Sequence, residues 1–96
     1  MTESYEHAAA ARGHPPILVL GRDDCEDTTR SRAHLEARGI PFEYRKVDED
    51  PQADAHIRSL NDGHWRTPTI LFGHADAPYR ILREPSNDEL DDALGA

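Results

Sequence analysis

The stretch that decides the fold is ILVLGRDDCEDT, residues 17–28. It begins with four consecutive apolar residues, Ile17 to Leu20, and so short a run that stops at a glycine is typical of a strand buried on both faces. A polar turn follows, and the pattern then predicts a helix over residues 25–38 that ends at Gly39. The only cysteine of the chain, Cys25, is therefore expected at the N-terminus of this helix.

Beyond this stretch, the pattern predicts three more strands and two more helices. These are a strand over 42–47, a helix over 51–60, strands over 69–72 and 79–82 joined by a hairpin loop over 73–78, and a last helix opened by the capping box of Ser86 and Glu89. A strand–helix–strand start requires a right-handed parallel crossover, and the hairpin adds an antiparallel pair. The sequence therefore predicts an α/β domain of order β-α-β-α-β-β-α, a four-stranded mixed sheet flanked by three helices.

The size and charge of the chain limit its domain count and its partners. Ninety-six residues suit one small domain, with residues 1–14 as a flexible tail and 15–96 as the folded part. Nineteen acids against eleven bases give a net charge of −8. This balance disfavours nucleic acid and anionic membrane surfaces, because both bind through Lys and Arg. No apolar run approaches the ~20 residues of a membrane span, so we expect a cytoplasmic protein. We also expect it to be a monomer.

The surroundings of Cys25 contain opposing influences on its ionisation. One cysteine excludes an internal disulfide and a four-cysteine zinc site. The helix N-terminus, the Thr28 hydroxyl and the charge of Arg22 favour the thiolate. Four carboxylates that flank the thiol oppose it: Asp23, Asp24, Glu26 and Asp27. Each favourable and unfavourable effect is under about 1 kcal/mol after salt screening, so the sequence predicts a pKa close to that of a free thiol.

Four stretches together resemble the glutaredoxins, and within that group the actinobacterial mycoredoxins. They are ILVLGRDDCEDT (17–28), RGIPFEYRKVDEDP (38–51), LNDGHWRTPTILF (60–72) and EPSNDELDDAL (84–94), in the family's order and spacing. The resemblance implies a thioredoxin fold and a site for thiol–disulfide exchange. It also implies a low-molecular-weight thiol, mycothiol or glutathione, as co-substrate and disulfide-bearing proteins as clients.

The resemblance assigns roles to individual residues. Cys25 resembles the family's attacking cysteine, and Arg22 occupies the place of a lysine that helps to hold the carboxylate of the small thiol. Pro68 resembles the family's cis-proline, and Thr67 the residue whose backbone pairs with the bound thiol. The remaining residues implied to flank or grip the small thiol are Trp65 as an apolar wall, Arg66, Ser86, Asn87 and Asp88.

The chain departs from the family at the second cysteine, which is Thr28 here. The site therefore reads C-E-D-T, a degenerate monothiol form in which Thr28 would stabilise the thiolate. A dithiol mechanism is impossible, so the resolving thiol must come from another molecule. The usual Gly-Gly pair before the last helix is Glu84-Pro85.

Two classes of function remain open from the sequence. In the first, the chain is a monothiol thiol–disulfide oxidoreductase that acts on protein mixed disulfides. In the second, it is a non-catalytic thioredoxin-fold binding module for a protein or small-thiol partner, with Cys25 inert and Ser86 and Asp88 acting only as helix caps. No metal is expected, because none of the six histidines lies four residues from another.

Overall fold

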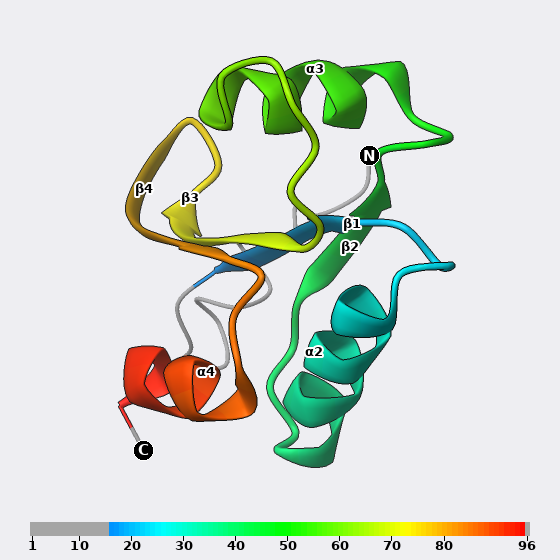
Figure 1. Ribbon diagram of the computed structural model, residues 1–96. Coiled ribbons are helices and arrows are strands. Elements are labelled where there is room, and N and C mark those ends of the chain that lie inside the picture. Colours follow the sequence, from blue (N-terminus) through cyan, green and yellow to red (C-terminus); the bar gives the residue numbers. More distant parts are fainter. Residues whose placement is uncertain (1–15, 96) are drawn as a thin grey trace, which may run out of the picture.

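The fold has the predicted order of strands and helices (Figure 1). The computed structural model describes residues 16–95, so the expected tail over residues 1–14 lies outside the described part. The elements are β1 (Ile17–Gly21), α2 (Glu26–Ala37), β2 (Glu43–Lys46), α3 (Pro51–Leu60), β3 (Thr69–His74), β4 (Ala77–Arg83) and α4 (Asn87–Leu94). Between residues 16 and 95, no helix is long and apolar enough to cross a membrane.

The four strands form one mixed sheet in the order β2-β1-β3-β4. Strand β1 pairs in parallel with β2 and antiparallel with β3, so that Val19 lies opposite both Tyr44 and Ile70. Strand β4 pairs antiparallel with β3. The continuous apolar run in β1 is explained by this central position, since all of its side chains are buried on one face or the other.

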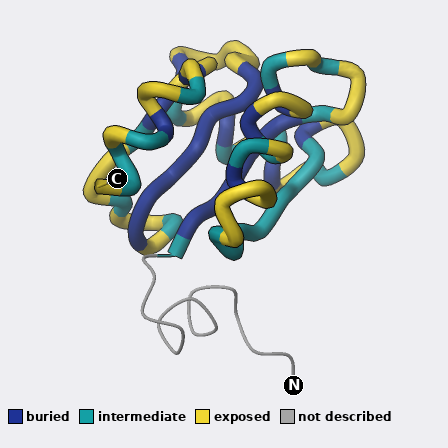
Figure 2. The backbone as a smooth tube through the Cα atoms, turned by 90° about the horizontal axis from the view of Figure 1, so that it is seen from below, coloured by how far each residue is buried: buried dark blue, intermediate teal, exposed yellow. Residues whose placement is uncertain are grey.

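The helices cover both faces of the sheet, with α2 and α4 on one side and α3 on the other (Figure 1). On the face covered by α2 and α4, one apolar cluster joins the sheet to Leu35 and Leu90. On the face covered by α3, a second cluster joins the sheet to Ala53 and Ile57. Figure 2 shows the same layering, with buried strands at the centre and exposed turns on the outer side of the helices.

The helix starts follow the caps that the sequence carries, with one exception. The Asp50 carboxylate accepts from the backbone N–H groups of Gln52 and Ala53 at 2.9 and 3.3 Å. The Ser86 hydroxyl accepts from the Glu89 N–H at 3.1 Å, and the Glu89 carboxylate accepts from the Ser86 N–H at 3.0 Å. Helix α2 has no such cap, because its N-cap residue is Cys25 itself rather than an aspartate.

The prediction of a long hairpin loop over residues 73–78 was wrong. Strand β3 continues to His74 and β4 begins at Ala77, and these two residues pair with each other. Gly73 makes this extension feasible, because it adopts φ +100 at an irregularity in the register. A Cβ atom there would lie 2.8 Å from the Tyr79 ring, so a glycine is required for close packing as well.

Candidate active site around Cys25

Cys25 is placed at the end of β1 by the short turn over residues 22–24. Its backbone N–H donates to the Arg22 carbonyl at 3.3 Å, and its carbonyl accepts from Thr29 at 3.1 Å as the first turn of α2 forms. The side chain is half-exposed, because the extended N-cap conformation turns it out of the helix. The thiol is therefore accessible and lies beside the unpaired N–H groups of the helix N-terminus.

Thr67 contacts the thiol through two of its own atoms. Its hydroxyl donates to the Cys25 Sγ atom at 3.3 Å, and its carbonyl oxygen accepts from the thiol at 3.4 Å. The Thr67–Pro68 peptide bond is cis, as the resemblance implies, and both residues are buried where β3 begins. One residue thus supplies an acceptor for the thiol and a donor for the thiolate.

The pKa of Cys25 is lowered from its ordinary value of 9.0. Burial is the largest single influence and raises this pKa, but hydrogen bonds from the Thr67 hydroxyl and from the backbone N–H groups of Thr28 and Asp27 are among the influences that outweigh it. Hydrogen bonds therefore decide the direction, and the predicted cancellation between the helix terminus and the flanking acids does not describe this site.

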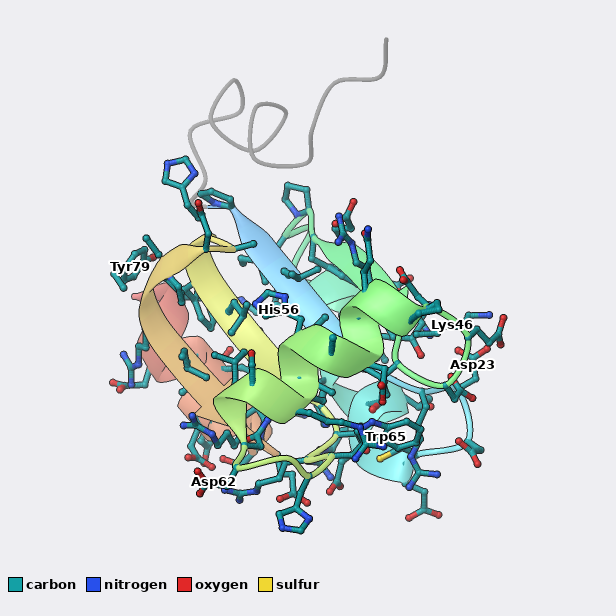
Figure 3. The ribbon with its side chains drawn as sticks, turned by 90° about the horizontal axis from the view of Figure 1, so that it is seen from above. Asp23, Lys46, His56, Asp62, Trp65 and Tyr79 are labelled. Atoms are coloured by element: carbon teal, nitrogen blue, oxygen red, sulfur yellow. The ribbon has the colours of Figure 1, made fainter. Side chains whose placement is uncertain are left out.

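The flanking acids fail to dominate because three of the four are paired with bases. Asp23 accepts from Lys46 at 3.0 Å and from the Tyr44 hydroxyl at 2.9 Å. Figure 3 shows Asp23 and Lys46 together at the edge of the molecule. The two other pairs are Asp24 with Arg22 at 3.2 Å and Asp27 with Arg30 at 2.8 Å. Each pair reduces the negative potential at Cys25.

Thr28, in the position of a second cysteine, is fully buried under the end of β1. A Cβ atom on Gly21 would lie 2.7 Å from both the methyl and the hydroxyl of Thr28, so these two residues pack directly on each other. The Thr28 hydroxyl has no hydrogen-bond partner of ordinary geometry, although its position on the thiol side contributes to lowering the Cys25 pKa. Its predicted role at the thiolate stays a prediction.

Two surface depressions, one beside Cys25 and one at the start of α4, lie on either side of Arg30. They have volumes of about 340 and 440 Å³ and share Arg30; together we call them the thiol groove. The first is lined by Asp23, Asp24, Cys25, Glu26, Thr29 and Arg30. The second is lined by Arg30, Glu84, Ser86, Asn87, Asp88 and Glu89. Three predicted residues of the last helix thus line a depression that shares Arg30 with the depression beside the thiol.

Arg30 is a groove residue that the sequence reasoning missed. Its guanidinium donates to the Asp27 carboxylate at 2.8 Å and to the Pro85 carbonyl at 2.9 Å. It therefore links α2 to the segment before α4, in the middle of the groove. Its position five residues after Cys25 would have indicated a place near the thiol, but only the fold brings Pro85 to it.

Six predicted residues lie outside the lining of both depressions: Thr28, Thr67 and Pro68, described above, and Arg22, Trp65 and Arg66. The guanidinium of Arg22 is occupied by Asp24, and that of Arg66 by the Glu84 carboxylate at 3.0 Å. The predicted wall residue, Trp65, lines a separate depression and donates to Asp54 at 2.8 Å (Figure 3). The binding roles of Arg22 and Arg66 stay predictions.

A buried amide supports the loop that carries Thr67. The Asn61 side chain, 8% exposed, donates to the Ile57 carbonyl at 2.8 Å and to the Thr69 hydroxyl at 3.2 Å, and its oxygen accepts from Arg83 at 2.8 Å. The Thr69 hydroxyl in turn donates to the Arg66 carbonyl at 2.6 Å. This network joins α3 and β4 to the segment that ends at the cis-proline. Within residues 16–95, no group of three or more His, Cys, Asp or Glu side chains could hold a metal ion.

Comparisons with known proteins agree with this geometry. The chain is similar to the glutaredoxin of Archaeoglobus fulgidus, at a TM-score of 0.67 and 18% identity, over 88% of this chain and 91% of the other. It is also similar to a mutant of actin interacting protein 5, at a TM-score of 0.54 and 21% identity, over 94% of this chain and 85% of the other. These identities establish the fold alone, and the comparison with curated proteins found no match.

A family model extends the likeness from fold to sequence. The model described as Glutaredoxin matches residues 17–74, which is more than half of the chain and spans β1 to β3. The matched range includes Cys25, Thr67 and the cis-proline. Membership carries a redox function of the glutaredoxin type in general, with glutathione-type thiols as co-substrates. The chain belongs to the glutaredoxin family.

Proposed function

We propose that the chain is a monothiol, mycoredoxin-like thiol–disulfide oxidoreductase that acts on mixed disulfides between proteins and a low-molecular-weight thiol. The observation that carries this proposal is the double contact of Thr67 with Cys25, through its hydroxyl at 3.3 Å and its carbonyl at 3.4 Å. An inert cysteine requires neither the accessible position nor a donor that stabilises the thiolate.

The reaction proceeds in two exchange steps. The Cys25 thiolate attacks the small-thiol sulfur of the mixed disulfide, a new disulfide forms on Cys25, and the client leaves as a thiolate that takes a proton from water. A second small thiol, as thiolate, then attacks this disulfide, which releases the oxidised small disulfide and regenerates Cys25. Because Thr28 replaces a resolving cysteine, the second small thiol is obligatory.

The small thiol, mycothiol or glutathione, would lie along the thiol groove. Its backbone-like portion would pair with Thr67 beside Pro68, and its far end would reach Ser86, Asn87 and Asp88. The free backbone N–H groups at the start of α4 and the unpartnered Asn87 side-chain oxygen support binding there. Arg22 and Arg66 are assigned the same task by the resemblance.

A comparison of the wild-type chain with Cys25→Ser tests this function. Both are incubated with a protein that carries a fluorescent small thiol in a mixed disulfide, in the presence of an excess of free small thiol. The proposal predicts release of the fluorophore at a rate that Cys25→Ser reduces to the background. Equal, negligible release by both proteins would favour the non-catalytic binding module instead.

A further inference from the structure

The lining of the thiol groove contains more acids than bases, although three of its acids, Asp23, Asp24 and Glu84, are paired with bases outside the lining. Three carboxylates line the depression beside Cys25, and three more line the depression beside α4, whereas the shared Arg30 is the only base among the lining residues of both. The six acids are Asp23, Asp24, Glu26, Glu84, Asp88 and Glu89. A groove with walls of one sign concentrates ligands of the opposite charge.

The bases near the groove are already engaged by carboxylates of the chain. Arg30 is held by Asp27 at 2.8 Å and by a backbone carbonyl, and Arg66 is held by Glu84 at 3.0 Å. Each guanidinium keeps free N–H donors, but its charge is already partly neutralised by the paired carboxylate, which weakens its attraction for a ligand carboxylate. Three groove acids that form no ion pair with the described residues, Glu26, Asp88 and Glu89, would remain to repel it.

We propose that the thiol groove selects disulfides by charge, so that a disulfide whose small-thiol half is neutral or cationic reacts faster than one whose half is anionic. This inference rests on the proposed exchange at Cys25 and names the class of small thiol that the exchange prefers. A thiol that carries an ammonium group, or only hydroxyl and amide groups, avoids the repulsion. A thiol of net negative charge, such as glutathione with its two carboxylates and one ammonium group, does not.

Three symmetrical disulfides of similar size provide the test. They are cystamine with ammonium groups, bis(hydroxyethyl) disulfide without charge, and dithiodipropionate with carboxylates. In a single turnover of the reduced full chain, the Cys25 sulfur bonds to one sulfur of the reagent while the other leaves as a thiolate that is protonated by water. Mass spectrometry of the intact protein follows the formation of the mixed disulfide on Cys25 and gives its rate. Each rate is then divided by the rate at which the same reagent reacts with 2-mercaptoethanol, which corrects for the intrinsic reactivity of the reagent.

The proposal predicts that the normalised rate with cystamine exceeds that with dithiodipropionate about tenfold at low salt. Because the preference is electrostatic, it should shrink to within about twofold at about 0.5 M salt. An equal rate for all three reagents, or a preference for dithiodipropionate, would overturn the charge selection. No reaction with any reagent would instead overturn the proposed function.

Matched variants distinguish the groove from the net charge of the whole chain. The double variant Glu26→Gln with Asp88→Asn removes two groove charges and should reduce the cystamine preference about threefold. The control, Glu36→Gln with Asp76→Asn, removes two charges near the end of α2 and at the β3–β4 turn, both exposed and outside the lining of the groove. It should keep the wild-type preference. An equal loss in both variants would contradict selection by the groove.

Discussion

The Thr67 hydroxyl donates a hydrogen bond to the Cys25 Sγ atom across 3.3 Å, and this contact joins the cis-proline loop to the N-terminus of α2. Of the influences that lower the Cys25 pKa, this hydrogen bond is the largest. Only burial, which raises the pKa, has a larger effect. The contact connects residues 42 positions apart and exists only in the folded chain.

Replacement of Thr67 by Val should therefore raise the Cys25 pKa, because the isosteric side chain has no hydroxyl donor. A smaller thiolate fraction at neutral pH should slow alkylation by iodoacetamide about three- to tenfold. Thr67→Ser keeps the donor and serves as the control, with a rate close to that of the wild type. An unchanged pH profile of alkylation in Thr67→Val would show that the hydroxyl does not stabilise the thiolate.

The Gly21→Ala substitution should destabilise the protein through Thr28. The new Cβ would lie 2.7 Å from two Thr28 atoms, and overpacking of this kind costs about 1–3 kcal/mol of the free energy of unfolding. In a Thr28→Ala background, the methyl and hydroxyl that clash are absent, so the same substitution should cost less. Urea denaturation of all four proteins measures the coupling, and equal costs in both backgrounds would contradict the direct packing.

The Asn61→Ala substitution should weaken both stability and reactivity. It removes the Asn61 donor from the Ile57 carbonyl and the Thr69 hydroxyl, both buried contacts, which costs about 1–3 kcal/mol. Because the same network holds the segment before Pro68, alkylation of Cys25 should also slow. Ser59→Ala removes an exposed hydroxyl from the same helix and should change stability by less than about 0.5 kcal/mol. A loss of the same size in both variants would contradict this role.

Acid should destabilise the fold partly through Asp91 of α4. Its pKa is lowered chiefly by the hydrogen bond with His34, against the effect of burial, and also by Arg38. A carboxyl whose pKa is lower in the folded state contributes stability above its unfolded pKa, and this contribution is lost as the pH falls through the folded pKa. The melting temperature of the wild type should therefore fall below about pH 4.

The Asp91→Asn variant should melt lower at neutral pH and lose less on acidification, since its side chain cannot be protonated. Thermal unfolding followed by circular dichroism measures both effects. Asp76→Asn at the hairpin turn provides the control for net charge and should retain the acid response of the wild type. An identical acid response in Asp91→Asn and the wild type would show that Asp91 does not contribute.

The fold could be predicted because its signals are local. The buried run of β1 and the Ser86 capping box are each complete within a few residues, and both were found. The hairpin was mispredicted because its tight form depends on Gly73 at φ +100, a conformation that the residue type permits but does not specify.

The site was predicted less completely because its electrostatics depend on tertiary contacts. Four acids beside Cys25 were expected to oppose ionisation, but the parallel pairing of β1 and β2 brings Lys46 to Asp23, and no local pattern indicates that pair. The same reason applies to Arg30, whose contact with Pro85 connects α2 to the distant segment before α4. Positions were predictable from spacing, whereas the partners of charged side chains were not.

In the proposed reaction Cys25 exchanges as a single thiol, and one titration distinguishes this from any dithiol route. The reduced full chain is mixed with an excess of protein mixed disulfide, and the released client thiol is measured as free small thiol is added. Without small thiol, we expect one equivalent of client to be released per Cys25. After small thiol is added, we expect continuous turnover at a rate that rises with the concentration of small thiol. Repeated turnover without small thiol, or no released client at any concentration, would contradict the proposed single-thiol exchange.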